Sequence, residues 1–94
     1  MSTPHIVIQQ HDSGLYEWLA LYHQEKIDSE VGDTSITGCL ISAVGAIPET
    51  EKLVEITYQG IHMGTFHKGQ IEKYTEGVSK RIVAEHTHLI QYLP

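Results

Sequence analysis

Hydrophobic and polar residues along the first part of the chain follow the patterns of short strands. Ile6, Val7 and Ile8 form a β-branched run that predicts a strand. Residues 12–14 predict a turn, because Asp12 and Ser13 bond readily to nearby backbone and Gly14 accepts a positive φ. Residues 15–22 then alternate in character and are rich in aromatic side chains, which favours a second strand over a helix.

A polar segment follows the second predicted strand. Residues 25–31 predict a third strand, short and polar, centred on Ile27 and placed at an edge of the sheet. Its row of unpaired backbone groups would be open to another chain. Glu25 and Lys26 on the same strand are residue types that keep such an edge from pairing with a second copy.

The middle of the chain changes to a helical period. Asp33, Thr34 and Ser35 are all competent to cap a helix N-terminus. Apolar residues then fall on one helical face, and Pro48 ends the helix. These apolar residues are Ile36, Cys39, Leu40, Ala43, Val44 and Ile47.

A second hairpin is predicted around a two-residue turn at Gln59 and Gly60. The expected register pairs Tyr58 with Ile61, Ile56 with Met63, and Val54 with Thr65. One face would then carry Val54, Ile56, Tyr58, Ile61 and Met63. The opposite face would carry Glu55, Thr57, His62 and Gly64, with Leu53 and Phe66 paired near the far end.

The last quarter of the chain predicts one long amphipathic helix over residues 70–92, bent at Gly77. Its apolar positions are Ile71, Tyr74, Val78, Ile82, Leu89 and Leu93. The sequence therefore predicts a single α+β domain over residues 1–94. The expected order is βββ-α-ββ-α, with a mainly antiparallel sheet covered by two helices.

Composition narrows the possible functions. Twelve acidic and six basic residues give a net charge of −6, which argues against sequence-independent binding to phosphates and suits an acidic surface facing a basic protein. Cys39 is the single cysteine, so no intrachain disulfide can form. No apolar run approaches the roughly 20 residues of a membrane span, and residues 1–5 lack the basic start of a signal peptide. A cytoplasmic location is expected.

The residues that carry chemistry do not form a known motif. Seven histidines are present, but His86 and His88 are two residues apart and point in different directions on a helix, so no metal and no cofactor are expected. Cys39 lies on the apolar helical stripe, which indicates a core residue and not a nucleophile. The turn explains Asp12 and Ser13 without a catalytic triad.

An aromatic group on the second strand is the best candidate for a binding surface. Tyr16, Trp18 and Tyr22 either form an exposed platform or pack under the helices. No lysine or arginine lies between residues 5 and 24, so stacking of nucleobases is not expected. We predict a protein-binding site from these aromatic residues together with Glu25 and Asp28.

The order of elements carries a family resemblance. Three strands with the turn at residues 12–14, followed by a helix that opens at Thr34 and contains Leu40, Ala43, Ala46 and Ile47, resemble the front half of the ribonuclease H-like fold. Gly32, Asp33 and Thr34 before that helix are similar to the related HicB antitoxin domains. The resemblance covers about residues 5–60 and implies either two-metal nuclease chemistry or an antitoxin role.

The chain departs from this family at the positions that carry its chemistry. The resemblance implies metal-binding carboxylates on strand one, the first helix and the fourth strand, and these positions fall on His11, Cys39 and Gln59. Asp12 is one residue away from the first of them, and Glu85 does not match the further acid of the closing helix. One aspartate cannot neutralise two metal ions and a transferred phosphate. HicB proteins also usually add a DNA-binding tail, and none is evident within residues 1–94.

Three functional hypotheses follow from the sequence. The first is a non-catalytic protein-binding module, an inhibitor or antitoxin-like protein that acts on a nucleic-acid-binding partner or pairs with itself, with a homodimer slightly favoured. The second is a remnant ribonuclease H-like or other hydrolase built around His11, Asp12 and Cys39. The third is a nucleic-acid-binding module that uses Lys68, Lys73, Lys80 and Arg81 on the last helix.

Overall fold

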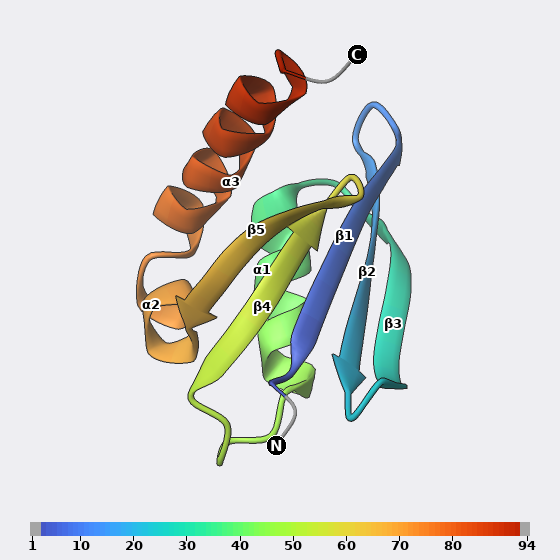
Figure 1. Ribbon diagram of the computed structural model, residues 1–94. Helices are drawn as coiled ribbons and strands as arrows, with labels where there is room; N and C mark the ends of the chain where they lie inside the picture. The colour runs from blue at the N-terminus through green and yellow to red at the C-terminus, as the bar shows by residue number, and fades with distance from the viewer. Residues whose placement is uncertain (1–2, 93–94) are drawn as a thin grey trace.

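Two strand units lie side by side in one five-stranded sheet of order β3-β2-β1-β4-β5 (Figure 1). The computed structural model describes residues 3–92. The strands are β1 (His5–Asp12), β2 (Leu15–Tyr22), β3 (Glu25–Asp33), β4 (Leu53–Tyr58) and β5 (Ile61–His67). Neighbouring strands are antiparallel except β1 and β4, which are parallel. The α+β class and the order of elements are as the sequence predicts.

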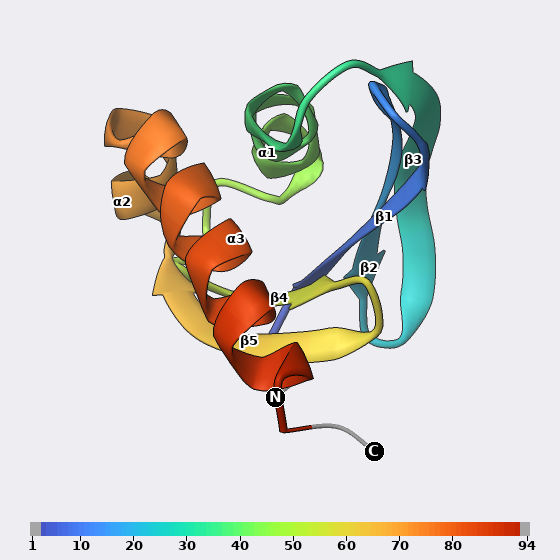
Figure 2. The same cartoon turned by 90° about the horizontal axis from the view of Figure 1, so that it is seen from above.

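The helices lie together on one side of the sheet. They are α1 (Ile36–Ala46), the short α2 (Lys68–Lys73) and α3 (Thr75–Ile90). The view from above shows the sheet curving around this side, with α1 and α3 on its concave face (Figure 2). The opposite face of the sheet carries no helix among the described residues. Along a regular strand, successive side chains therefore point alternately toward the helices and toward the open face of the sheet.

The core lies between the concave face and the helices. Ile6 and Ile8 of β1 are fully buried, as are Val54 and Ile56 of β4. All the apolar positions predicted for the first helix are buried, including Cys39. Ser35 caps this helix, since its hydroxyl accepts a hydrogen bond of 3.0 Å from the Gly38 amide.

The second hairpin has the predicted turn but a different register. Tyr58 pairs with Ile61 as expected, but Ile56 pairs with Gly64 and Val54 with Phe66. The predicted Ile56–Met63 and Val54–Thr65 pairs are wrong, because the register shifts at Met63. The shift moves Phe66 onto the buried face.

Strand β3 is polar and lies at an edge, as predicted, but it is not short. It runs for nine residues, from Glu25 to Asp33. Two register shifts against β2 interrupt it. Its length matters because it exposes a long row of backbone groups along one side of the sheet.

The last helical segment breaks at Tyr74 and not at Gly77. Tyr74 has φ −127° and ψ 45°, outside the helical region, so α2 and α3 are separate helices. The Thr75 hydroxyl donates a hydrogen bond of 2.6 Å to the Ile71 carbonyl at the end of α2. This bond satisfies a carbonyl that has no intrahelical partner. Leu93, predicted to continue the helical stripe, lies outside the described residues.

Two glycines in different backbone conformations should respond in opposite ways to substitution by alanine. Gly64 has φ +113°, a conformation that side chains rarely adopt, whereas Gly45 lies in α1 with open space where the Cβ of an alanine would lie. Gly64→Ala should lower the free energy of unfolding by about 1–3 kcal/mol. Gly45→Ala should raise it by about 1 kcal/mol. Urea unfolding measures both, and a stabilising Gly64→Ala would contradict the register described above.

Candidate functional site

The acidic residues of β3 all lie on one side of that strand. Residues directly opposite each other in a ladder project their side chains to the same face of the sheet. Trp18 and Ala20 of β2 are buried under the helices, so their partners on β3 point to the same side. The four acidic residues of β3 all pair with this set: Glu25 with Tyr22, Asp28 with Ala20, Glu30 with Trp18, and Asp33 with Tyr16.

The two register shifts in β3 produce this arrangement. Strict alternation would place Glu25 and Asp33 on one face and Asp28 and Glu30 on the other. Ile27 and Gly32 are the extra residues at the shifts, and each reverses the alternation once. Gly32 adopts φ +122°, which glycine accepts without a steric penalty. We call these four residues the acidic row: Glu25, Asp28, Glu30 and Asp33.

Three residues of the acidic row are open to solvent. Glu25, Asp28 and Glu30 are exposed, and Asp33 is partly buried at the approach to α1. The other side of β3 carries Lys26, Ser29 and Val31, which pair with Leu21, Leu19 and Glu17. Val31 is 56% exposed and Ile27 is 42% exposed, so apolar side chains accompany the charge along this edge.

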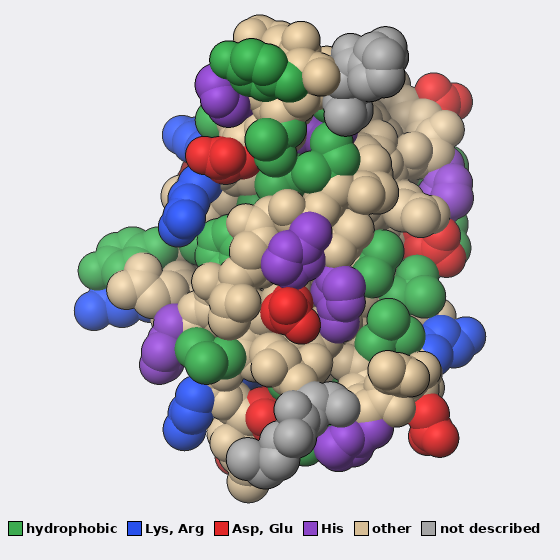
Figure 3. All heavy atoms as spheres, viewed as in Figure 1, with side chains coloured by type: hydrophobic (Ala, Val, Ile, Leu, Met, Phe, Trp, Pro, Cys, Tyr) green, Lys and Arg blue, Asp and Glu red, His purple; other side chains and the backbone are tan. Residues whose placement is uncertain are grey.

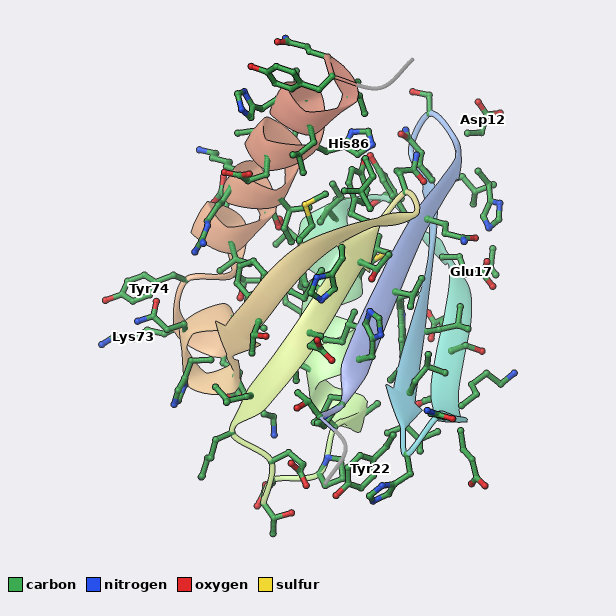
Figure 4. The ribbon with its side chains drawn as sticks, in the orientation of Figure 1. Asp12, Glu17, Tyr22, Lys73, Tyr74 and His86 are labelled. Carbon is green, nitrogen blue, oxygen red and sulfur yellow. The ribbon has the colours of Figure 1, made fainter. Side chains whose placement is uncertain are left out.

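Charge is divided unevenly between the two parts of the chain. Residues 1–33 contain six acidic residues and one basic residue, which places −5 of the net −6 charge there. In the space-filling view most lysine and arginine side chains lie over α2 and α3, on the side away from β3 (Figure 3). Figure 4 shows the same separation, with Glu17 near β3 and Lys73 on the far side. Most of the net negative charge therefore belongs to β1, β2, β3 and their turns.

The basic residues predicted as a nucleic-acid-binding patch do not share one helix or one role. Lys68 lies in α2, is only 9% exposed, and donates a hydrogen bond of 3.3 Å to the Ile47 carbonyl at the end of α1. Arg81 stacks over the Phe66 ring at 5.0 Å, and Lys80 pairs with Glu76 at 3.8 Å. Lys73 lies over the Tyr74 ring, and both point away from the domain (Figure 4).

The aromatic residues predicted as a binding surface have three different positions. Trp18 is only 3% exposed and belongs to the core under the helices. Tyr16 is partly buried and packs against that core. The Tyr22 hydroxyl donates a hydrogen bond to Glu51, which raises the pKa of Tyr22. These three side chains point to the helix-covered side and do not form a platform on the open face. Glu25 and Asp28 belong to the acidic row.

A polar cluster lies at the centre of the open face. Glu55, Thr57 and His62 share this face, as the sequence predicts, and the parallel pairing of β1 with β4 adds His5. His5 and Thr57 form a hydrogen bond of 2.6 Å, and His62 lies 3.3 Å from Glu55. Burial lowers the pKa of His5, which favours the neutral form of its ring. The sequence alone does not place His5 in this cluster, because that position depends on the pairing of β1 with β4, which are far apart in the chain.

The residues named in the hydrolase hypothesis have separate contacts within the fold. His11 forms a hydrogen bond of 2.9 Å with Glu17, and the Asp12 carboxylate accepts one from the Ser13 amide. Cys39 is buried in the core, where desolvation and the nearby Asp33 raise its pKa to about 12. The Gln59 side chain accepts a hydrogen bond of 2.8 Å from the Gln10 amide. His11, Asp12 and Gln59 therefore each have a hydrogen bond within the fold, and Cys39 belongs to the core.

Residues 3–92 also lack two features that would point to other functions. No group of three or more His, Cys, Asp or Glu side chains is arranged to hold a metal ion within this range. No helix within it is long and apolar enough to cross a membrane.

The surroundings of Cys39 predict a thiol that does not react in the folded protein. Its exposed fraction is 0%, and a pKa of about 12 keeps it protonated at pH 7–8. A thiol reagent should therefore reach Cys39 only when the whole domain unfolds. The native protein should be labelled more slowly than the urea-unfolded chain, on the order of a thousandfold or more for a stable domain. Mass spectrometry over time measures both rates. Labelling of the native protein as fast as the unfolded chain would contradict the buried position.

Comparisons with protein families, with curated proteins and with solved structures found no match to this chain.

Proposed function

We propose that this chain is a non-catalytic protein-binding module that uses the β3 side of its sheet to bind a basic partner. The observation that carries the proposal is the acidic row, which gathers four carboxylates on one side of an edge strand. Complementary charge increases the rate of encounter and excludes acidic competitors. Exposed Ile27 and Val31 add the apolar area that a charged surface alone lacks.

The proposed partner is a protein that itself binds nucleic acid. Such proteins carry clusters of lysine and arginine that contact phosphates. An acidic module that covers such a cluster would compete with the nucleic acid. This is the action of an inhibitor or of an antitoxin-like protein, as the HicB resemblance also suggests.

The two other functions suggested by the sequence have less support. A ribonuclease H-like hydrolase needs several carboxylates at one place, and His11, Cys39 and Gln59 occupy the corresponding positions. A nucleic-acid-binding patch needs lysine and arginine side chains that are free to reach phosphates. Lys68 and Arg81 instead contact the fold itself.

A photo-crosslinking residue at Ile27 tests the proposed surface. In cells of the native host, this position on β3 should give a discrete adduct with a basic protein. Tyr74 is a matched control, because it is 54% exposed but lies on the far side at the α2–α3 junction (Figure 4). The control position should give little adduct. A discrete adduct at Tyr74 with none at Ile27 would show that the binding surface lies elsewhere.

Two sets of charge-neutralising substitutions distinguish binding through β3 from an effect of the net charge of the protein. Glu25→Gln, Asp28→Asn and Glu30→Gln together should reduce the Ile27 adduct on the order of tenfold, because steering by charge changes association rates by about 10–10³-fold. Glu72→Gln, Glu76→Gln and Glu85→Gln change the net charge equally but lie on α2 and α3. This second set should leave the adduct unchanged. Equal losses in both triple variants would contradict binding through β3.

A further inference from the structure

We infer that β3 binds an extended basic segment of its partner as a sixth strand of the sheet. This inference rests on the proposed function and adds the mode of binding and the pattern of the bound segment. The partner strand would carry lysine or arginine at every second residue. Those side chains would point to the helix-covered side of the sheet, beside the acidic row.

The position of β3 in the sheet supplies the first part of the argument. Only β2 pairs with β3 among the described strands, so one row of its backbone amides and carbonyls has no strand beside it. Such an edge is a template for main-chain hydrogen bonds from an added strand. β3 runs for nine residues, and the four between its register shifts are enough for a short added strand.

The register shifts define where an added strand can pair regularly. Residues 28–31 lie between the two shifts, and they pair with β2 without interruption. Within this segment Asp28 and Glu30 point to the helix-covered side, and Ser29 and Val31 point to the open face. A regular partner strand therefore meets two carboxylates on one side, and a hydroxyl and an apolar side chain on the other.

Charge selects a basic strand over a second copy of this chain. Two copies paired through β3 would bring two acidic rows together, with only Lys26 from each copy to offset them. Like charges on neighbouring strands are destabilising, whereas opposite charges stabilise a cross-strand pair. The slight preference for a homodimer that the sequence suggests is therefore not favoured at this edge.

The other edge of the sheet lacks a comparable pattern. Strand β5 contains no Asp, Glu, Lys or Arg, so charge does not select a partner there. It also has a register shift at Met63, next to Gly64 in a positive-φ conformation. Strand addition is therefore assigned to β3.

Peptides with blocked backbone amides test this mode of binding. The probe is a capped nine-residue peptide with Lys at every second position and Thr between, which matches the length of β3. Two further peptides have the same side chains but carry N-methyl groups either on the lysines or on the threonines. Amides of alternate residues in a strand point to opposite edges, so only one of the two methylated peptides loses the bonds to β3.

The expected result is a difference between the two methylated peptides. One should bind like the unmethylated probe, and the other should bind more weakly by about tenfold or more, because several main-chain hydrogen bonds are lost. Fluorescence anisotropy measures affinity. Nuclear magnetic resonance should show slowed amide exchange and new cross-strand contacts within residues 28–31. Neutralising Glu25, Asp28 and Glu30 should weaken binding of the probe, whereas neutralising Glu72, Glu76 and Glu85 should not.

Three results would overturn the inference. If both methylated peptides bind like the probe, charge attracts the peptide without strand pairing, and the proposed function still stands. If no peptide binds, strand addition is wrong, and crosslinking at Ile27 alone decides the proposed function. If light scattering shows a dimer and crosslinks join the β3 strands of two copies, the edge belongs to self-association.

Discussion

The parallel pairing of β1 with β4 joins the two halves of this protein. Residues 5–33 and 53–67 each form antiparallel strands by local turns, and neither set alone encloses a core. Register pairs from His5–Glu55 to Ile8–Tyr58 connect them, with a flanking bond of 3.0 Å from the Gln59 amide to the Ile8 carbonyl. Parallel neighbours need a long connection, and α1 lies in that connection. The fully buried Ile6, Ile8 and Ile56 show that this junction is also the centre of the core.

Local chemistry in the sequence predicts the elements well. The start of α1, its helical stripe through Cys39 and the turn at Gln59 depend on neighbours within a few residues, so each can be recognised from the chain alone. The sequence leaves Asp33, Thr34 and Ser35 as possible N-caps, and the structure selects Ser35. The helix break at Tyr74 could not be predicted in the same way. It depends on how α2 packs against α1 and on the bond from Thr75 to the Ile71 carbonyl, whereas Gly77 is the more obvious weak point in the sequence.

Register shifts explain both the error in the second hairpin and the incomplete prediction of the site. A side chain changes face whenever one residue is added to one strand of a pair. Met63 does this in β5, and Ile27 and Gly32 do it in β3. The sequence predicts Glu25 and Asp28 as binding residues, but strict alternation places them on opposite faces. Gly32 is the signal that points to the shift, since a glycine inside a polar strand often marks one.

The charges on β3 have two consequences that depend on each other. An edge strand needs protection from pairing with further copies, and charged residues supply it. In β3 the protecting charges on the helix-covered side are all negative, because the acidic row is aligned there. Lys26 points to the open face. If the proposal holds, repulsion between copies and attraction of a basic strand would come from the same carboxylates, three of which are exposed. Scattering these charges over both faces would still repel a second copy, but it would not select a partner with a basic residue at every second position.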